Sequence, residues 1–164
     1  MTNNKNKAVF LDRDGVLNRE IGDYVCHFED FEILDNFETL KTLQDRGYLL
    51  IVATNQGGLA KGWYNETELA KMHNHLRETY QNHGIQITDI FYCPHHPNFT
   101  GDCDCRKPKP GLLLQGIEKY NLDPEKSYFI GDRERDIEAA TAANVTGILI
   151  DSNQPLSDVI GLIG

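Results

Sequence analysis

The chain has 164 residues, 40% of them hydrophobic and 25% charged, and a formal net charge of −9. A chain of this size can bury roughly two thirds of the surface that it exposes when unfolded, so one core suffices and no disulfide framework is needed. The acidic balance argues against broad nucleic-acid binding, which needs a basic face, and a sequence without an apolar run of about 18 residues has no membrane span.

Neither the first residues nor the composition mark an export signal or a second domain. Residues 1–7 are polar and lack the apolar centre of a secretory signal, so we expect a cytoplasmic protein. Repeats, low-complexity segments and Pro/Gly/Ser-rich linkers are absent from the sequence. We therefore predict one domain over residues 1–164, a monomer without nucleic-acid or membrane partners.

A short apolar run at residues 9–11 ends in two carboxylates, Asp12 and Asp14, and Gly15 follows them. Such a run is typical of a buried parallel strand. Side chains two residues apart in extended backbone leave on the same side, and a glycine allows a sharp turn. One carboxylate could attack phosphorus while the other works as acid and base, with a divalent cation relieving their repulsion. The alternative is an ordinary Asp-Gly surface turn.

The next segment reads as a loop, a helix and a second strand. Residues 16–35 show no sustained helical or strand periodicity of apolar residues, and the segment is too short for a separate cap domain. A helix is expected over 36–46 and a buried strand over 48–53, which ends at Thr54. The threonine hydroxyl and the backbone N–H groups of 54–58 could hold a phosphate. An ordinary loop held by an Asn turn is the alternative.

A second helix is expected to begin after Asn65. This residue has the N-cap chemistry, and Glu68 stands at the capping-box spacing for a helix that runs to about His83. Two histidines of this helix, His73 and His75, lie two residues apart and hence on different faces. We interpret them as surface residues and not as metal ligands.

A third strand, predicted at 89–92, leads into a loop rich in metal-binding side chains. Three thiolates and one imidazole are the set that a closed tetrahedral zinc site takes, and here they fall at Cys93, His95, Cys103 and Cys105. Their spacing is tighter than in common zinc fingers, which predicts a metal-folded loop; metal-free thiols are the alternative. Arg106 and Lys107 follow directly, so the metal would fix their direction, unless they form a plain solvated basic turn.

The remaining elements alternate between helix and strand. Helices are expected over 110–120 and from 132 to 143, and strands over 127–132 and 146–150. Three buried runs thus end at Asp12, Thr54 and Asp132. In an open parallel sheet the carboxyl ends of the strands gather in one crevice where ligands bind. We predict a doubly wound α/β fold with a mainly parallel sheet and a site at that edge.

Four motifs, in order, resemble those of the haloacid dehalogenase superfamily of phosphatases; they fall at Asp12 and Asp14, Thr54, Lys107, and Asp132 with Asp136. The resemblance covers nearly the whole chain and implies a Rossmann-like doubly wound sheet without a cap domain. It implies that Asp12 attacks the phosphate ester to form an aspartyl-phosphate, while Asp14 protonates the leaving oxygen and later activates water. It also implies Mg²⁺ held by Asp12, the backbone carbonyl of Asp14 and Asp132. Asp136 would support the ion, and Thr54 and Lys107 would bind the phosphoryl oxygens.

Two groups within this superfamily share the zinc loop and the Cys-Asp-Cys-Arg-Lys-Pro run: the D-glycero-D-manno-heptose 1,7-bisphosphate 7-phosphatases and the histidinol-phosphate phosphatases. Segments 54–62, 92–97 and 107–111 are more similar to the heptose group, and 131–136 is more similar to the histidinol group. We predict a magnesium-dependent phosphomonoesterase that removes the 7-phosphate of the heptose bisphosphate. A histidinol-phosphate phosphatase is the first alternative, and a non-catalytic phosphosugar-binding protein is the second.

In a protein without a cap, substrate selection must come from loops, here 16–25, 55–63 and the zinc loop. Arg106 is expected to bind a distal anionic group of the substrate, because a guanidinium can bind phosphate through two hydrogen bonds. Further substrate-binding residues are expected at Arg13, Asn55, Gln56, Gly57 and Arg133.

Overall fold

The sheet of the computed structural model has five strands, which pair in parallel in the order β3-β2-β1-β4-β5. They are β1 (Lys7–Leu11), β2 (Tyr48–Asn55), β3 (Ile87–Cys93), β4 (Tyr128–Gly131) and β5 (Thr146–Leu149). The structure describes residues 4–164; residues 1–3, part of the polar start on which the expected cytoplasmic location rests, lie outside the described residues. The predicted parallel α/β sheet is confirmed.

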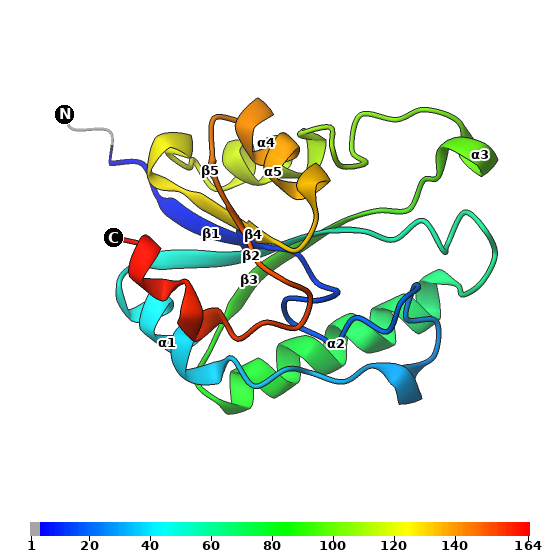
Figure 1. Cartoon of the computed structure of the whole chain (residues 1–164), viewed down its shortest axis with the longest axis horizontal. Helices are drawn as coiled ribbons and strands as arrows, with labels where there is room; N and C mark the ends of the chain where they lie inside the picture. Colours follow the sequence, from blue (N-terminus) through cyan, green and yellow to red (C-terminus); the bar gives the residue numbers. More distant parts are fainter. Residues whose placement is uncertain (1–3) are drawn as a thin grey trace.

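Helices cover both faces of this sheet, with α1 and α2 on one side and α4 and α5 on the other (Figure 1). They are α1 (Phe37–Asp45), α2 (Glu66–Asn82), α3 (Pro97–Thr100), α4 (Gly111–Lys119) and α5 (Glu134–Ala142). Short 3-10 turns lie at Phe28–Asp30, Pro124–Lys126, Leu156–Asp158 and Ile160–Leu162. Across residues 4–164, no helix combines the length and the apolar character that crossing a membrane requires.

The helices and strands lie where the sequence predicts them, with small shifts at their ends. The capping box of α2 is confirmed: the Asn65 side chain accepts from the Glu68 amide, and the Glu68 carboxylate accepts from the Asn65 amide. β3 begins at Ile87, earlier than predicted. The short helix α3 was not predicted; it lies inside the predicted zinc loop, residues 93–105, called the cysteine loop below. Pro97 at its first position and the His96 side chain at its N-cap explain why a helix forms there.

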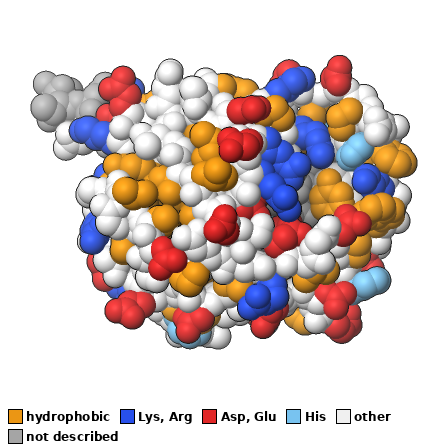
Figure 2. All heavy atoms as spheres, viewed as in Figure 1, with side chains coloured by type: hydrophobic (Ala, Val, Ile, Leu, Met, Phe, Trp, Pro, Cys, Tyr) orange, Lys and Arg blue, Asp and Glu red, His pale blue; other side chains and the backbone are white. Residues whose placement is uncertain are grey.

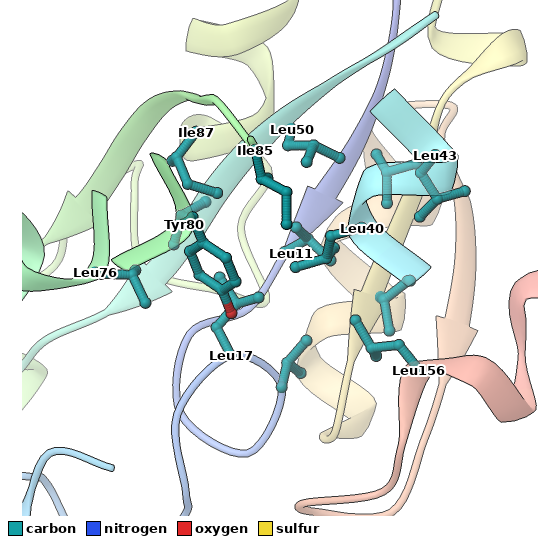
Figure 3. Close-up of a cluster of buried hydrophobic side chains, with 14 of the residues drawn as sticks. Leu11, Leu17, Leu40, Leu43, Leu50, Leu76, Tyr80, Ile85, Ile87 and Leu156 are labelled. Atoms are coloured by element: carbon teal, nitrogen blue, oxygen red, sulfur yellow. The ribbon is translucent and has the colours of Figure 1, made fainter. Parts of the chain in front are cut away.

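Alternate side chains of β1 face two separate cores. Leu11 packs with Leu40 and Tyr80 in the core beneath α1 and α2 (Figure 3). Phe10 lies in the second core against Phe129, with ring centroids 6.5 Å apart. Burial on both faces explains why this strand reads as a continuous apolar run. Each such side chain stabilises the fold by about 1.5–3 kcal/mol on burial.

Strands β1, β2 and β4 end at the same edge of the sheet. Leu11 pairs with Val52 on one side and Ile130 on the other, and the Asp12 amide donates to the Ile130 carbonyl at 3.0 Å. Strand order reverses between β1 and β4, because β2 and β3 extend the sheet one way and β5 the other. Ligands of open α/β sheets bind at such a switch point.

Candidate active site

A cavity of about 230 Å³ opens at the carboxyl ends of β1, β2 and β4. Its wall contains many of the residues predicted from the motifs: Asp12, Asp14, Thr54, Asn55, Lys107, Asp132 and Arg133. The sequence did not single out its other lining residues: Glu20, Gly22, Asp23, Tyr24 and Arg135. Lys and Arg side chains gather beside acidic ones on the face shown in Figure 2. The cavity is therefore polar and carries charges of both signs.

Lys107 is the buried centre of this site. Its ammonium group lies 3.0 Å from Asp12 Oδ1, 2.7 Å from Asp136 Oδ1 and 3.0 Å from the Ala53 carbonyl oxygen. Burial alone would lower the pKa of Lys107, but the two carboxylates outweigh it and raise that pKa. The Asn55 side chain accepts from the Lys107 amide at 3.0 Å and donates to its carbonyl at 3.2 Å. Asn55 thus fixes the backbone that carries the lysine.

Carboxylates outnumber cations in this site. Oxygen atoms of Asp12, Asp132 and Asp136 lie within 4.8 Å of one another, and Asp14 faces the same cavity. Burial, together with the neighbouring carboxylates, raises the pKa of Asp12 even though Lys107 opposes the shift. Against these four acids stand two buried cations, Lys107 and Arg13, so the site is two positive charges short. Hard oxygen ligands with this charge deficit suit Mg²⁺.

Gly15 allows the acids of β1 and β4 to approach each other. Its φ of +86° lies in the left-handed region, where side chains with a Cβ are strained. A Cβ at this position would lie 2.1 Å from Asp132 Oδ2. That oxygen accepts a hydrogen bond from the Ser152 hydroxyl at 2.6 Å, and Arg133 Nε lies 4.0 Å from it. Glycine is therefore required both for the turn and for the position of Asp132.

Three residues around the first motif are buried where the sequence predicts accessible ones, and the predicted surface position of His73 is wrong. Arg13 was expected to bind substrate, but its side chain is 0% exposed and pairs with Asp14 at 2.8 Å. Arg13 stands in a bend after β1, and its guanidinium lies inside the protein between Asp14 and His73. His73 was expected at the surface but is 4% exposed and lies against Arg13. Gln56 is also buried, so its side chain holds other residues of the site and does not reach the cavity.

Gly57 and Arg106 meet loop 16–25 at the rim. A Cβ on Gly57 would lie 2.8 Å from Tyr24 Oη and 2.9 Å from Arg106 Nη1, so the absent side chain lets these groups come close. The Arg106 guanidinium donates to the His95 carbonyl at 3.2 Å. Arg106 thus lies beside Tyr24 and does not itself line the cavity.

Two arginines at the start of α5 face the cavity. The Arg133 amide donates to Asp136 Oδ2 at 3.1 Å, and its exposed side chain lines the cavity 4.0 Å from Asp132 Oδ2. Arg135 lines the same wall one residue before Asp136. Arg133 is among the residues predicted to bind substrate, whereas Arg135 belongs to none of the motifs and was not predicted. Tyr24 and Glu20 came only within the general prediction that loop 16–25 contributes to selection.

The cysteine loop brings together three of its four predicted metal ligands. The Cys93 sulfur lies 2.7 Å from that of Cys105 and 3.6 Å from that of Cys103, and the last two are 3.7 Å apart. The imidazole of His95 does not join this set within 4.8 Å. The backbone carbonyl of His95 accepts from the Arg106 guanidinium, so the contact of His95 with Arg106 is made by its main chain and not by its imidazole. Three gathered thiol sulfurs are the kind of ligand that a soft metal ion takes.

The fold, with acids after β1 and β4, a threonine at the end of β2 and a buried lysine between the acids, is that of a phosphatase of the haloacid dehalogenase superfamily. The family model described as HAD-hydrolase-like matches residues 104–158. The D-glycero-beta-D-manno-heptose-1,7-bisphosphate 7-phosphatase of Pasteurella multocida is 39% identical over 158 residues, covering 93% of this chain and 85% of that protein.

Two further comparisons agree. A D-glycero-alpha-D-manno-heptose-1,7-bisphosphate 7-phosphatase of Photorhabdus laumondii is 39% identical over 165 residues, covering 96% of this chain and 90% of that protein. The crystal structure of D,D-heptose 1,7-bisphosphate phosphatase from B. bronchiseptica, complexed with magnesium and phosphate, superposes with a TM-score of 0.83 at 28% identity. The superposition covers 96% of this chain and 87% of the B. bronchiseptica chain. The chain belongs to the family of D-glycero-D-manno-heptose-1,7-bisphosphate 7-phosphatases.

Proposed function

We propose that this protein removes the 7-phosphate of D-glycero-D-manno-heptose 1,7-bisphosphate, with residues 1–164 forming one capless catalytic domain. The observation that carries the reaction is the Asp12 carboxylate, held by Lys107 in the cavity that Asp14 also lines. The names of the similar proteins support the substrate. Histidinol phosphate, the alternative from the sequence, receives no support from these relatives.

The hydrogen bonds of Asp12 leave one oxygen for attack. Its Oδ1 accepts from the Lys107 ammonium at 3.0 Å and from the Arg13 amide at 2.8 Å. We assign Oδ2 as the nucleophile that bonds to phosphorus as the ester oxygen departs, giving an aspartyl-phosphate. Thr54 and Lys107 would bind the phosphoryl oxygens, since both line the cavity.

Asp14 would transfer protons in both halves of the reaction. It gives a proton to the departing ester oxygen and then takes one from the water that attacks the aspartyl-phosphate. Burial would raise the pKa of Asp14, but Arg13 and hydrogen bonds from Asn18 and Gln56 outweigh it and lower that pKa. The carboxylate form suits the second half, and in the first half the proton must reach Asp14 as the substrate binds.

The excess of carboxylates supports a magnesium site. Asp12, Asp132 and the backbone carbonyl of Asp14 would hold Mg²⁺ with Asp136 in support, and the bound ion would neutralise charge on the transferring phosphoryl group. Ser152 keeps Asp132 directed into the site.

A second phosphate on the substrate would find arginines around the cavity. Arg133 and Arg135 line it, and Arg106 lies at its rim beside Tyr24. A guanidinium is well suited to a dianionic phosphate, because it can donate two parallel hydrogen bonds. A cationic substrate such as histidinol phosphate would gain nothing from them. The wall therefore favours a bisphosphate.

A side-by-side assay tests the substrate. With Mg²⁺ present, we expect kcat/KM for phosphate release from heptose 1,7-bisphosphate to exceed that from histidinol phosphate by roughly 10- to 100-fold, the value of one or two charge-assisted hydrogen bonds. Both anomers of the bisphosphate should be included, because the similar proteins carry names for each. A preference for histidinol phosphate would overturn the substrate assignment and leave the phosphatase chemistry standing.

We further propose that Cys93, Cys103 and Cys105 bind zinc, with the imidazole of His95 turning in as the fourth ligand. The three sulfurs are already gathered, and Lys107 follows the last of them by two residues. The metal would thus hold the backbone that presents this lysine to Asp12. Second-sphere support of this kind sets the geometry of a site.

Removal of zinc should impair catalysis while Mg²⁺ is kept saturating. We expect chelation to make residues 94–104 protease-sensitive and to lower kcat/KM by roughly 100-fold, the cost of a misplaced catalytic group. Metal content, limited proteolysis and phosphate release check this together. His95→Ala should weaken zinc retention, with His96→Ala as its neighbouring control. Full activity in folded, zinc-free protein would contradict the proposal.

A further inference from the structure

Both oxygens of the Asp14 carboxylate are held by buried donors. Oδ1 accepts from Arg13 Nη2 at 2.8 Å and from Asn18 Nδ2 at 2.8 Å. Oδ2 accepts from Gln56 Nε2 at 3.1 Å. A carboxylate bound from both sides cannot rotate about its Cβ–Cγ bond without breaking one of these bonds. The direction of its remaining lone pairs is therefore set by the residues behind Arg13 and Gln56.

Behind Arg13 lies His73 of α2. Arg13 Nη1 is 3.2 Å from His73 Nε2, and since a guanidinium has no acceptor, that nitrogen must present its lone pair. Burial, and then the charges of Arg13 and Arg77, lower the pKa of His73 to about 3, so the ring stays neutral. The Phe31 ring lies 5.2 Å from the Arg13 guanidinium carbon. His73 thus satisfies a donor that water cannot reach and fixes the angle of the guanidinium.

Behind Gln56 lies Tyr64. Its hydroxyl donates to Gln56 Oε1 at 2.5 Å, which turns the two N–H bonds of the amide towards Asp14 and towards Thr54 Oγ1 at 3.0 Å. With the amide reversed, its carbonyl oxygen would face the Asp14 carboxylate and repel it. Thr54 Oγ1 thus accepts from Gln56, and its own hydroxyl proton has only a long contact of 3.5 Å with the Asn55 carbonyl, which a phosphoryl oxygen would replace. One phenol therefore orients groups on two residues of the site.

We propose that His73 and Tyr64 are positioning residues for the proton transfers of Asp14, acting through Arg13 and Gln56. The inference rests on the proposed function, because it assigns Asp14 as the acid that protonates the leaving oxygen. An alkoxide leaves poorly unless that proton is delivered along the breaking bond, and a well-placed acid contributes 10²–10⁴-fold. A carboxyl group released from one of its two chains rotates and delivers the proton less well.

The dependence on leaving group separates this role from general support of the fold. A sugar phosphate needs its departing oxygen protonated, whereas p-nitrophenolate leaves without a proton. For Tyr64→Phe and His73→Leu we expect kcat/KM to fall about tenfold or more on the sugar bisphosphate. On p-nitrophenyl phosphate, the fold decrease in kcat/KM should be less than about one third of the fold decrease on the sugar bisphosphate. The value of kcat/KM covers binding and all steps up to departure of the leaving group, so it includes the first proton transfer of Asp14 and excludes the second.

Two matched variants complete the experiment. His73→Gln keeps an acceptor at the same distance from the backbone and should recover most of the activity lost in His73→Leu. Tyr80→Phe removes the hydroxyl of a second buried tyrosine, which lies on α2 and has no hydrogen-bond partner among residues 4–164. This variant should leave kcat/KM unchanged on both substrates. Thermal melting identifies a variant that fails to fold. If His73→Leu fails to fold, the nearly isosteric Tyr64→Phe still tests the proposal.

Equal losses on both substrates, or no loss in Tyr64→Phe, would overturn the positioning role. Wild-type protein that hydrolyses p-nitrophenyl phosphate and another alkyl phosphate but not the heptose bisphosphate would overturn the substrate instead, and the comparison would then use that alkyl ester. Wild-type protein that releases phosphate from no ester would overturn the proposed function and this inference together.

Discussion

Asp12→Asn should abolish phosphatase activity, with a loss of roughly 10⁴-fold or more in kcat, the size seen when a covalent nucleophile is removed. The asparagine carbonyl can still accept from the Arg13 amide and Lys107, as Oδ1 of Asp12 does now. Its Oδ2 is replaced by an amide nitrogen, which cannot attack phosphorus. We expect the fold to persist, because the change removes one negative charge from a cluster in which carboxylates outnumber cations. Phosphate release and thermal melting measure the two effects.

The same variant tests the covalent intermediate. Substrate trapped by rapid acid quench should leave a phosphoryl group on the peptide containing Asp12 in the wild-type protein and none in Asp12→Asn. Asp89→Asn, a change at a carboxylate of β3 that pairs with Lys119, is the control and should remain fully active. Residual activity above about 1% of wild type in Asp12→Asn would mean that another group attacks phosphorus.

Much of the fold follows from short-range patterns in the sequence. Buried apolar runs and the polar residues that end them were enough to predict the strands and their shared edge. The same alternation that placed Asp12 and Asp14 on one side also places Arg13 on the opposite side. Full burial does not follow from the pattern, because an arginine is almost never fully buried unless it is paired. Its partner was the neighbouring Asp14 itself.

His73 could have been found from the sequence. With Leu69, Met72 and Leu76 it forms the i, i+3, i+4, i+7 pattern that marks the buried face of a helix. The spacing of His73 and His75 shows only that the two rings lie on different faces of the helix. It does not show which of the two faces is buried. Tyr64 and Arg135 carried no such signal. Their roles depend on contacts made after the chain has folded.

Long-range contacts in the site had no local pattern to predict them. Lys107 meets Asp12 across 95 residues of sequence, and only the family resemblance placed the two together before the structure did. The position of His95 is a similar case. Spacing indicates which sulfurs can gather, but the rotation of a side chain in a loop depends on neighbours such as Arg106.

Lys107→Met should cost both stability and activity. The change removes the only cation in contact with two buried carboxylates, Asp12 and Asp136, among residues 4–164. Breaking a buried pair in this way costs about 3–5 kcal/mol, because a charge is left without compensation. We also expect kcat to fall roughly 10²- to 10³-fold, as for the loss of a donor that stabilises charge in the transition state. Urea unfolding and phosphate release measure the two losses.

The stability loss should depend on pH with a definite sign. Burial and the acid cluster raise the pKa of Asp12 in the folded state, so the folded protein binds a proton more readily than the unfolded one. Without the lysine this effect grows, and stability should recover as the pH falls from 8 towards 5. In the wild-type protein the raised pKa of Lys107 means that its contribution is complete at neutral pH and is lost only as the pH rises through that pKa.

Lys119→Met is the matched control, because that lysine makes its ion pair with Asp89 at the surface, where its side chain is 59% exposed. Exposed pairs contribute about 0–1 kcal/mol, and its removal should leave activity unchanged. Lys107→Arg should not rescue the variant, since a planar guanidinium does not fit where one ammonium group meets three acceptors. A small, pH-independent loss in Lys107→Met would mean that Asp12 and Asp136 share a proton instead of relying on the lysine. The acid cluster would then need no fixed cation, and the charge deficit that supports magnesium would shrink with it.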